Sequence, residues 1–466
     1  KDYEQIFRGL VDPEWYKQEA RKYKIPKWNY SRLVELAKTN WLIRMVHRTI
    51  IQEVTRPGWE IQPKFLLKCR DCGAEYQTSD IEECRQCGSK NLEPPDLKQF
   101  RTVKDFLEKP NPNKSLLDII RSMIWWGLTV GDYYLYIQKV KVGRVTVNFM
   151  DVIDARTIRI GMDLYGRIKT NEYFCPKCYQ PDEYTTINEG EEPPKCEKCG
   201  KRMVETAYIQ TLAGKVVARF SADEIIHKAF DQLHPEPYGT SKLVSVYKIA
   251  TTLAHVDQLN YEFYSQGRLG GFLNFPGYSR KDLEEIESYI KTQLKEEQTV
   301  DIVTGQLQSS KKTRFLLVGS QEPIQFIKVF DDYKKLQSLE FYQTYIRAVC
   351  GVYGVTPTFV SITEGRGYQG RMLLDVQNRT TREIQSIIED SFNNQLLPKL
   401  GVTDWIFKFR EVESADELRE KEIMATQAEA ALNFVRAGFN VKINPRTRDL
   451  EVTGEGKLTP AMIPTG

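Results

Sequence analysis

The sequence predicts an α+β fold of roughly three domains, and three observations support this prediction. The chain has 466 residues, which is enough to bury several hydrophobic cores. Strand patterns gather between residues 132 and 220, whereas long amphipathic helical patterns follow from residue 241 onward. Two short stretches rich in cysteine, Cys69–Gly88 and Cys175–Gly200, interrupt these patterns and indicate separate small modules.

The charge balance and the hydropathy pattern exclude two broad classes of protein. Lys and Arg total 66 and Asp and Glu total 63, so the net charge is +3. A protein that holds nucleic acid by neutralising phosphates over its whole surface would be far more basic, so any DNA contact should be local or weak. No run of about 18 uncharged apolar residues is present, and we therefore expect no membrane contact.

Eight of the nine cysteines form four C-x-x-C pairs, which predict two structural metal centres. The pairs are Cys69/Cys72 with Cys84/Cys87, and Cys175/Cys178 with Cys196/Cys199. Four thiolate ligands leave no open coordination position, so we expect two structural zinc ions per subunit, with iron as an alternative. Paired disulfides are the other alternative, but nothing indicates an oxidising compartment. The ninth cysteine, Cys350, lies in an apolar run and is expected to be buried.

The elements from residue 115 to residue 220 are predicted from caps and alternation. Ser115 should cap an apolar helix, and Gly127 and Gly131 should break it. Three strands should follow, DYYLYIQKV, RVTVNFMDV and ARTIRIGMD. The second cysteine module then enters, and the chain resumes as the strand pair AYIQTLAG and KVVARF. This order suggests that the module interrupts a single sheet.

Long helices dominate the predicted second half. One helix should run from Ser241 to about Gln266, and a second should start near Asp331 and end before Pro357, which cannot continue it. A compact α/β segment lies between them. The polar loop ITEGRGYQGR should lead to a third helix over 372–397, followed by the strand DWIFKFR, two helices and a tail rich in Pro and Gly.

Catalytic signatures are absent from the sequence. It contains no phosphate-binding GxxxxGK[ST] loop, no GxSxG elbow and no HExxH motif. The four histidines are scattered, and His227, close to a predicted strand end, is expected to be structural. We therefore expect a protein that is not an enzyme.

The order of several stretches resembles the portal proteins of tailed double-stranded DNA viruses, the phage portal family. The stretches are EKPNPNKSLLDIIRSMIWWGLTVGDYYLYI, DVIDARTIRIGMDLYGRI, FSADEIIHKAFDQLHPEPYGTSKL, FYSQGRLGGFLNFPG and AVCGVYGVTPTFV. Each is a loose pattern, but their order and spacing together are specific. The resemblance covers roughly residues 30–450 and leaves out the two cysteine modules, which look like insertions.

The resemblance implies a portal-type subunit with an α/β wing, long stem helices, a small α/β clip and a helical C-terminal crown. The implied segments are a wing at 1–240 with zinc-ribbon-like insertions at 66–90 and 172–203, stem helices at 241–268 and 330–355, a clip at 269–329, a tunnel loop at 356–370, a long helix and wing strand at 371–413, and a crown and tail at 414–466. In the tunnel loop, DNA contact would fall to Arg366, Tyr368, Gln369 and Arg371. The alternative for this loop is a flexible surface turn.

The function implied by the resemblance is a homo-oligomeric ring, a dodecamer, at one capsid vertex of the virion. Double-stranded DNA would pass through it during packaging and ejection, and the terminase motor, the major capsid and scaffold proteins and the neck or adaptor proteins would be its partners. The subunits would assemble in the host cytoplasm. The rival interpretation is a zinc-ribbon nucleic-acid-binding regulatory or processing factor. The first module opposes it, because Arg70 and Arg85 are outnumbered there by acidic residues.

Overall fold

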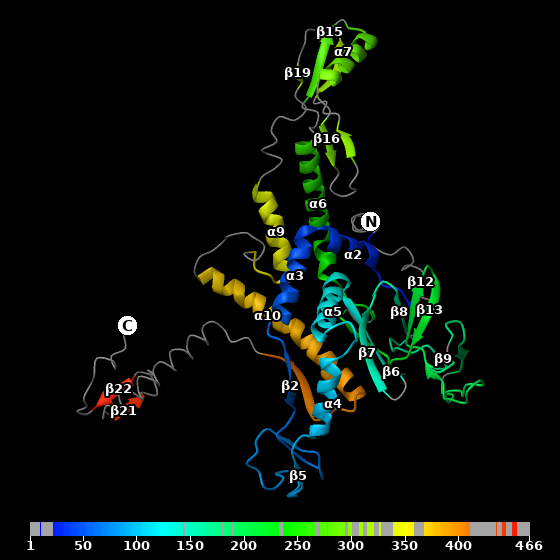
Figure 1. The fold of residues 1–466 in the computed structure, drawn as a ribbon, viewed down its shortest axis with the longest axis vertical. Helices are drawn as coiled ribbons and strands as arrows, with labels where there is room; N and C mark the ends of the chain where they lie inside the picture. The colour runs from blue at the N-terminus through cyan, green and yellow to red at the C-terminus, as the bar shows by residue number, and fades with distance from the viewer. Residues whose placement is uncertain are drawn as a thin grey trace. The chain divides into compact units, whose positions relative to one another are not determined.

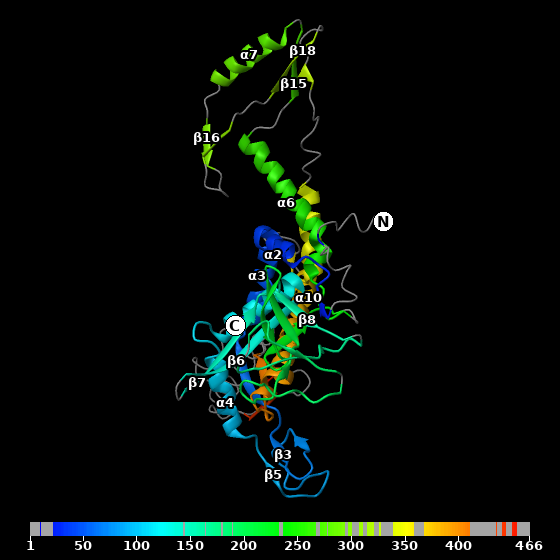
Figure 2. The same cartoon turned by 90° about the vertical axis from the view of Figure 1, so that its right-hand side faces the viewer.

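The structure is a computed structural model with mixed helix and sheet (Figures 1 and 2). It describes residues 10, 22–142, 145–163, 165–178, 180–188, 190–232, 236–266, 271–276, 278–293, 297–300, 307–310, 315–320, 326–327, 339–357, 368–410, 435, 440–443 and 450–453. The chain forms two compact units, Lys1–Lys408 and Phe409–Gly466. Among the described residues, no helix combines the length and the apolar character that crossing a membrane requires.

Three helices form the core of the first unit: α2 (Tyr30–Thr39), α3 (Trp41–Thr55) and α5 (Leu116–Val130). Asn40 is the single residue between α2 and α3, and its side chain serves both the cap and the packing. Its Oδ1 accepts from the Ile43 amide at the start of α3, and its Nδ2 donates to the Ala250 carbonyl. The turn between α2 and α3 is therefore held against α6 (Lys242–Gln266), to which Ala250 belongs.

Helix α5 begins as predicted but does not break at Gly127. Ser115 and Asp118 form a capping box, and Gly131 ends the helix with φ 91°. Gly127 stays helical, and a Cβ there would lie 2.6 Å from Cζ of Phe230. This glycine is required for close packing rather than for a break, and a partner so distant in sequence was not predictable locally.

Two sheets follow the predicted strands. One has the order β14-β6-β7, with β6 at Asp132–Val142, β7 at Val145–Ile153 and β14 at Ile225–Ala229. The other has the order β1-β8-β12-β13, with β1 at Tyr23–Lys24, β8 at Ile158–Gly161, β12 at Tyr208–Leu212 and β13 at Lys215–Phe220. Strands β8 and β12 pair directly, with Ile160 opposite Tyr208. The prediction that the second cysteine module interrupts one sheet is confirmed.

Each cysteine module carries a small three-stranded sheet. In the first module the strands are β3 (Leu67–Cys69), β4 (Glu75–Tyr76) and β5 (Leu92–Glu93). In the second they are β9 (Glu172–Phe174), β10 (Thr185–Thr186) and β11 (Val204–Glu205). The first module is flanked by β2 (Trp59–Pro63), which pairs with β20 (Trp405–Phe409), and by α4 (Leu97–Glu108).

The long helices α6 (Lys242–Gln266) and α9 (Leu339–Tyr353) pack against each other (Figure 1). The carboxylate of Asp257 on α6 joins them to α3, because it accepts from the Trp41 indole and from the Tyr342 hydroxyl, each at 2.9 Å. Residues 331–338, where the second helix was predicted to start, lie outside the described residues.

A small α/β module lies between α6 and α9 in the sequence. Its elements are β15 (Gly271–Pro276), α7 (Arg280–Gln293), β16 (Glu297–Val300), β17 (Leu307–Ser310), β18 (Phe315–Ser320) and β19 (Phe326–Ile327). Strand β15 pairs parallel with β18 and antiparallel with β19, and β16 pairs with β17. Helix α7 contacts β18, so an α/β segment is present between the two long helices, as expected.

The last elements differ from prediction at two points. Helix α10 (Tyr368–Ser391), followed by the π-helical turn η3 (Phe392–Leu396) and α11 (Leu397–Lys399), begins four residues before the predicted start at residue 372. In the second unit, β21 (Asn440–Ile443) and β22 (Leu450–Thr453) form an antiparallel pair that was not predicted. The physical reason is an overlooked alternation of apolar and polar residues in both stretches.

Candidate metal centres

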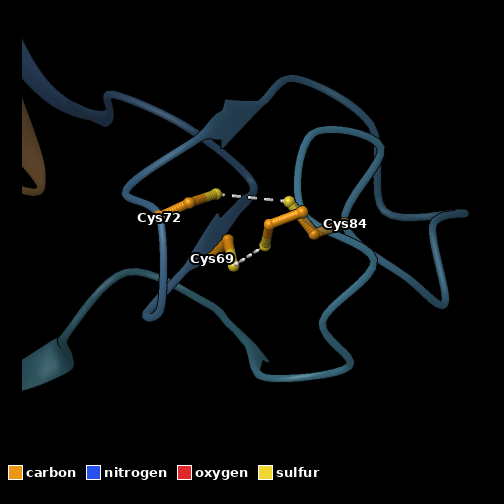
Figure 3. Close-up of side chains that lie close together, drawn as sticks. Cys69, Cys72 and Cys84 are labelled. Atoms are coloured by element: carbon orange, nitrogen blue, oxygen red, sulfur yellow. Dashed lines mark hydrogen bonds between the residues drawn. The ribbon is translucent and has the colours of Figure 1, made fainter.

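The first cysteine module brings four sulfur atoms together. The Sγ atoms of the four cysteines all lie within 4.8 Å of one another. The Cys72–Cys84 pair is 3.4 Å apart (Figure 3), and the Cys69–Cys87 pair is 3.6 Å apart. A disulfide would need about 2.05 Å, so these sulfurs are not bonded. Four thiolates around one zinc ion at about 2.3 Å would lie about 3.8 Å from one another, close to the observed spacing.

Local backbone bonds build the two turns that present these sulfurs. The Gly73 amide donates to the Cys69 carbonyl at 2.9 Å, and the Gly88 amide donates to the Cys84 carbonyl at 2.8 Å. Both glycines have positive φ, 78° and 71°, which side chains with a Cβ rarely adopt. The two C-x-x-C turns are therefore built from local backbone bonds.

A tyrosine that the sequence analysis missed supports the first centre. The Tyr76 hydroxyl lies 3.1 Å from the Cys84 sulfur and accepts a bond of 2.9 Å from the Arg85 amide. Because the amide donates to the hydroxyl oxygen, the hydroxyl hydrogen is available for the sulfur. This bond is the main reason why the pKa of Cys84 is lowered to about 6. An aromatic residue on the strand between the two turns was the signal available in the sequence.

The second module repeats the arrangement. Its four sulfurs also lie within 4.8 Å of one another, with Cys175 and Cys199 3.5 Å apart. The Gly200 amide donates to the Cys196 carbonyl at 2.8 Å, and Gly200 has φ 69°. The backbone amide of Cys178 points at the Cys175 sulfur and is the main cause that lowers the pKa of Cys175 to about 6. All eight predicted cysteines are thus gathered into two tetrads suited to a metal ion.

A charge cluster, formed by buried Glu172 and Arg219 with half-buried Tyr23 and exposed Lys22, ties the second module to the neighbouring sheet. Glu172 accepts from the Tyr23 hydroxyl at 2.6 Å, from the Arg219 guanidinium at 2.7 Å and from the Lys22 ammonium at 3.0 Å. The side chains of Glu172 and Arg219 are 8% and 6% exposed. Burial raises the pKa of Glu172, but the three donors outweigh burial and leave that pKa lowered. The sequence analysis missed this cluster because its members are far apart in the chain.

The charged groups of the first module are largely paired with each other. Arg70 bonds Glu93 at 2.6 Å, and Lys68 and Lys64 both bond Glu75. A surface that binds DNA phosphates needs cations that are not already neutralised. The first module therefore does not offer a phosphate-binding surface of the kind the rival interpretation requires.

The remaining predicted residues fall into three groups. His227 bonds buried Asp132 at 2.8 Å and stacks on Tyr134, so it is structural as expected. Cys350 is buried, and burial raises the pKa of its thiol to about 11. Of the four predicted DNA-contacting residues, Arg366 lies outside the described residues. The other three, Tyr368, Gln369 and Arg371, lie in the first turn of α10 rather than in a loop.

Comparison with known families matches residues 98–440 to a family described as phage portal protein. The chain is similar to a chain in the solved virion of a native gene transfer agent particle, with a TM-score of 0.49 and 12% identity over 90% of this chain and 93% of that chain. It is also similar to a chain in the neck of an empty gene transfer agent particle computed with C6 symmetry, with a TM-score of 0.47 and 12% identity over 91% of this chain and 95% of that chain. It is also similar to a crystal structure of an HK97 family phage portal protein from Corynebacterium diphtheriae (0.39, 12%, 80% and 94%). Comparison with curated proteins finds no match.

Proposed function

Because the chain belongs to the phage portal protein family, we propose that it forms the portal ring at one vertex of a capsid. The family match over residues 98–440 is the observation that carries this proposal. The ring is the channel through which double-stranded DNA is packaged and ejected. Identical contacts between two different faces, repeated around an axis, close as a ring, and we assign a dodecamer. Its location is the virion, after assembly in the host cytoplasm.

Two packed helices supply the channel wall in this proposal. Helices α6 and α9, held to α3 through Asp257, fit the stem segments 241–268 and 330–355. The α/β module between them in the sequence fits the clip at 269–329, on which the terminase motor and the neck proteins would dock. Residues 1–240 would form the wing, facing the major capsid and scaffold proteins, and residues 414–466 would form the crown and tail.

DNA contact in the channel is assigned to the tunnel loop at 356–370 and the start of α10. Arg366 and Arg371 would meet phosphates, and Tyr368 and Gln369 would make weaker polar contacts. The net charge of +3 suits a channel that must let DNA slide, because a densely basic wall would hold it.

Each cysteine tetrad is proposed to hold one structural zinc ion. The sulfur spacing and the closed set of four ligands support this assignment, and a closed set leaves no position for a reacting water. The role of the subunit is accordingly structural rather than enzymatic.

The oligomeric state of the purified protein tests the proposal. Native mass spectrometry and end-on negative-stain images should show a ring of about a dozen subunits with a central hole. A monomer or dimer that binds duplex DNA through its cysteine modules would refute the portal assignment and favour the regulator. Binding is best compared between the native chain and variants with serine in place of Cys69 and Cys72, or of Cys175 and Cys178, because only the regulator needs intact modules to bind DNA.

A further inference from the structure

We propose that an acidic loop of the second cysteine module, residues 182–192, docks into a cavity lined by arginine and tryptophan on the next subunit. The inference rests on the proposed ring and deepens it, because it names two surfaces that meet between neighbours. Each chain carries both surfaces, so the same contact can repeat around the ring.

The cavity has the composition of a protein interface. It lies where α2, α3 and α5 meet and has a volume of about 560 Å³, which is enough for several side chains. Trp41 and Met45 of α3 and Trp125 of α5 line it, together with three arginines. Tryptophan, methionine and arginine are residue types that protein interfaces favour. The lining residues do not include any from the second module, so a loop of that module that fills the cavity belongs to another copy of the chain.

The arginines give the cavity positive charge that the described part of the chain does not balance. Arg44 and Arg48 are exposed and lie four residues apart on α3, so their like charges repel each other. Neither forms an ion pair with a described residue, and none of the residues that line the cavity is acidic. The third arginine, Arg121, bonds Asp118 at 3.0 Å and is already partly neutralised. An occupant with carboxylates would relieve the repulsion by accepting from both free guanidinium groups.

The loop at 182–192 supplies carboxylates and an aromatic ring together. Its sequence, DEYTTINEGEE, contains five acidic residues and no basic residue. Asp182, Glu191 and Glu192 are exposed and form no ion pair with a described residue. Tyr184 has Arg219 at 4.0 Å from its ring centroid, yet it stays 45% exposed. The open part of this ring can pack against tryptophan while the carboxylates meet arginine.

Duplex DNA is the other polyanion that the proposed ring would meet, and the cavity suits it less well. A duplex binds through phosphates that need cations along an open surface. Its bases are stacked inside the helix, so it offers the two tryptophans little apolar surface. The combination of apolar walls with two free arginines therefore favours the protein loop.

Native mass spectrometry of the full-length protein over a concentration series tests the docking. Arg44→Glu with Arg48→Glu should raise the concentration at which half of the subunits are in rings by at least about tenfold. Asp182→Lys with Glu192→Lys should do the same, because like charges then face each other across the contact. All four substitutions in one chain should restore most of the assembly, since opposite charges meet again.

A matched control separates the docking from the change in charge. Lys98→Glu with Arg101→Glu reverses two exposed cations on α4, outside the cavity, and should assemble like the native chain. Thermal unfolding followed by circular dichroism shows whether each variant keeps its fold. Assembly of the variant with glutamate at 44 and 48 at native concentrations would overturn the docking and leave the portal proposal standing.

Photo-crosslinking locates the contact in a chain with native charges. With benzoylphenylalanine in place of Tyr184, rings should yield crosslinks to residues 41–52 or 121–125, which line the cavity. Rings mixed from isotope-labelled and unlabelled subunits show that the crosslink joins two chains. Crosslinks that map only elsewhere would refute the docking, whereas a native chain that forms no ring would overturn the portal proposal and the docking together. If the substitutions at 44 and 48 weaken duplex binding but leave assembly unchanged, the cavity binds phosphates instead.

Discussion

Burial of His47 makes the stability of the helical core depend on pH. His47 on α3 is 1% exposed, and its Nε2 lies 3.1 Å from the Tyr353 hydroxyl at the end of α9. Burial lowers the pKa of His47 from 6.5 to about 3. The folded chain therefore keeps this ring neutral, whereas the unfolded chain binds a proton below pH 6.5. The contribution of the neutral His47 ring to the free energy of unfolding is therefore fully present above pH 6.5 and is lost as the pH falls toward 3.

The size of the loss follows from the two pKa values. Between pH 7 and pH 5 the unfolded chain takes up most of one proton at His47 and the folded chain takes up almost none. The difference in bound protons, integrated from pH 7 to pH 5, is about 1.4. This corresponds to a loss of about 2 kcal/mol in the free energy of unfolding. Any folded pKa below about 4 gives nearly the same figure, because the unfolded value sets the window.

The assay is urea unfolding of the native chain and of His47→Gln at pH 7 and pH 5, at matched protein concentration because assembly adds stability. Glutamine keeps a polar partner for Tyr353 but cannot bind the proton. The native chain should lose about 2 kcal/mol more than the variant between the two pH values. The control is His255→Gln, which removes an exposed histidine on α6 and should keep the native slope. Equal losses in the native chain and His47→Gln, within about 0.5 kcal/mol, would refute the reasoning.

Four further substitutions test other features. Gly131→Ala should cost about 2–4 kcal/mol by thermal unfolding, because a Cβ would lie 2.8 Å from the Gly239 carbonyl carbon at φ 91°. Gly166→Ala, with φ 81° and open space around it, should cost only about 1 kcal/mol, and equal costs would contradict the packing argument. Asp132→Asn should lower the free energy of unfolding in urea by about 2–4 kcal/mol, because the buried Asp132 carboxylate accepts hydrogen bonds from several donors. An unchanged free energy of unfolding would contradict this role of the carboxylate. Tyr76→Phe should weaken metal binding at the first module by about tenfold in chelator competition, with the second module unchanged; equal weakening of both would exclude a local role.

Features set by neighbouring residues could be predicted from the sequence. The N-terminal cap at Ser115 and the gathering of the cysteines into two tetrads follow from short spacings and were confirmed. Gly127 shows the limit, because its role depends on Phe230, more than a hundred residues later. A glycine in an apolar helical pattern indicates either a break or a close contact, and local pattern alone does not distinguish them.

The support around the metal centres could not be predicted in the same way. Glu172 meets Arg219 and Tyr23 only because the sheet brings β1 and β13 close to β9. In the sequence these are ordinary charged and aromatic residues. The candidate metal ligands can therefore be identified from local spacing, whereas the contacts that position each cysteine tetrad depend on the tertiary fold.

Because β8 pairs with β12, the second module could be inserted or removed at one place in the sheet. The two strands lie side by side, and the Gly161 amide bonds the Ala207 carbonyl at 2.8 Å, so the module leaves and re-enters the sheet at almost one place. A short turn joining these strands could replace the whole insertion without changing the register of the sheet. A lineage could gain or lose the module in a single event, and the edge strand β1 would be the element that has to adapt.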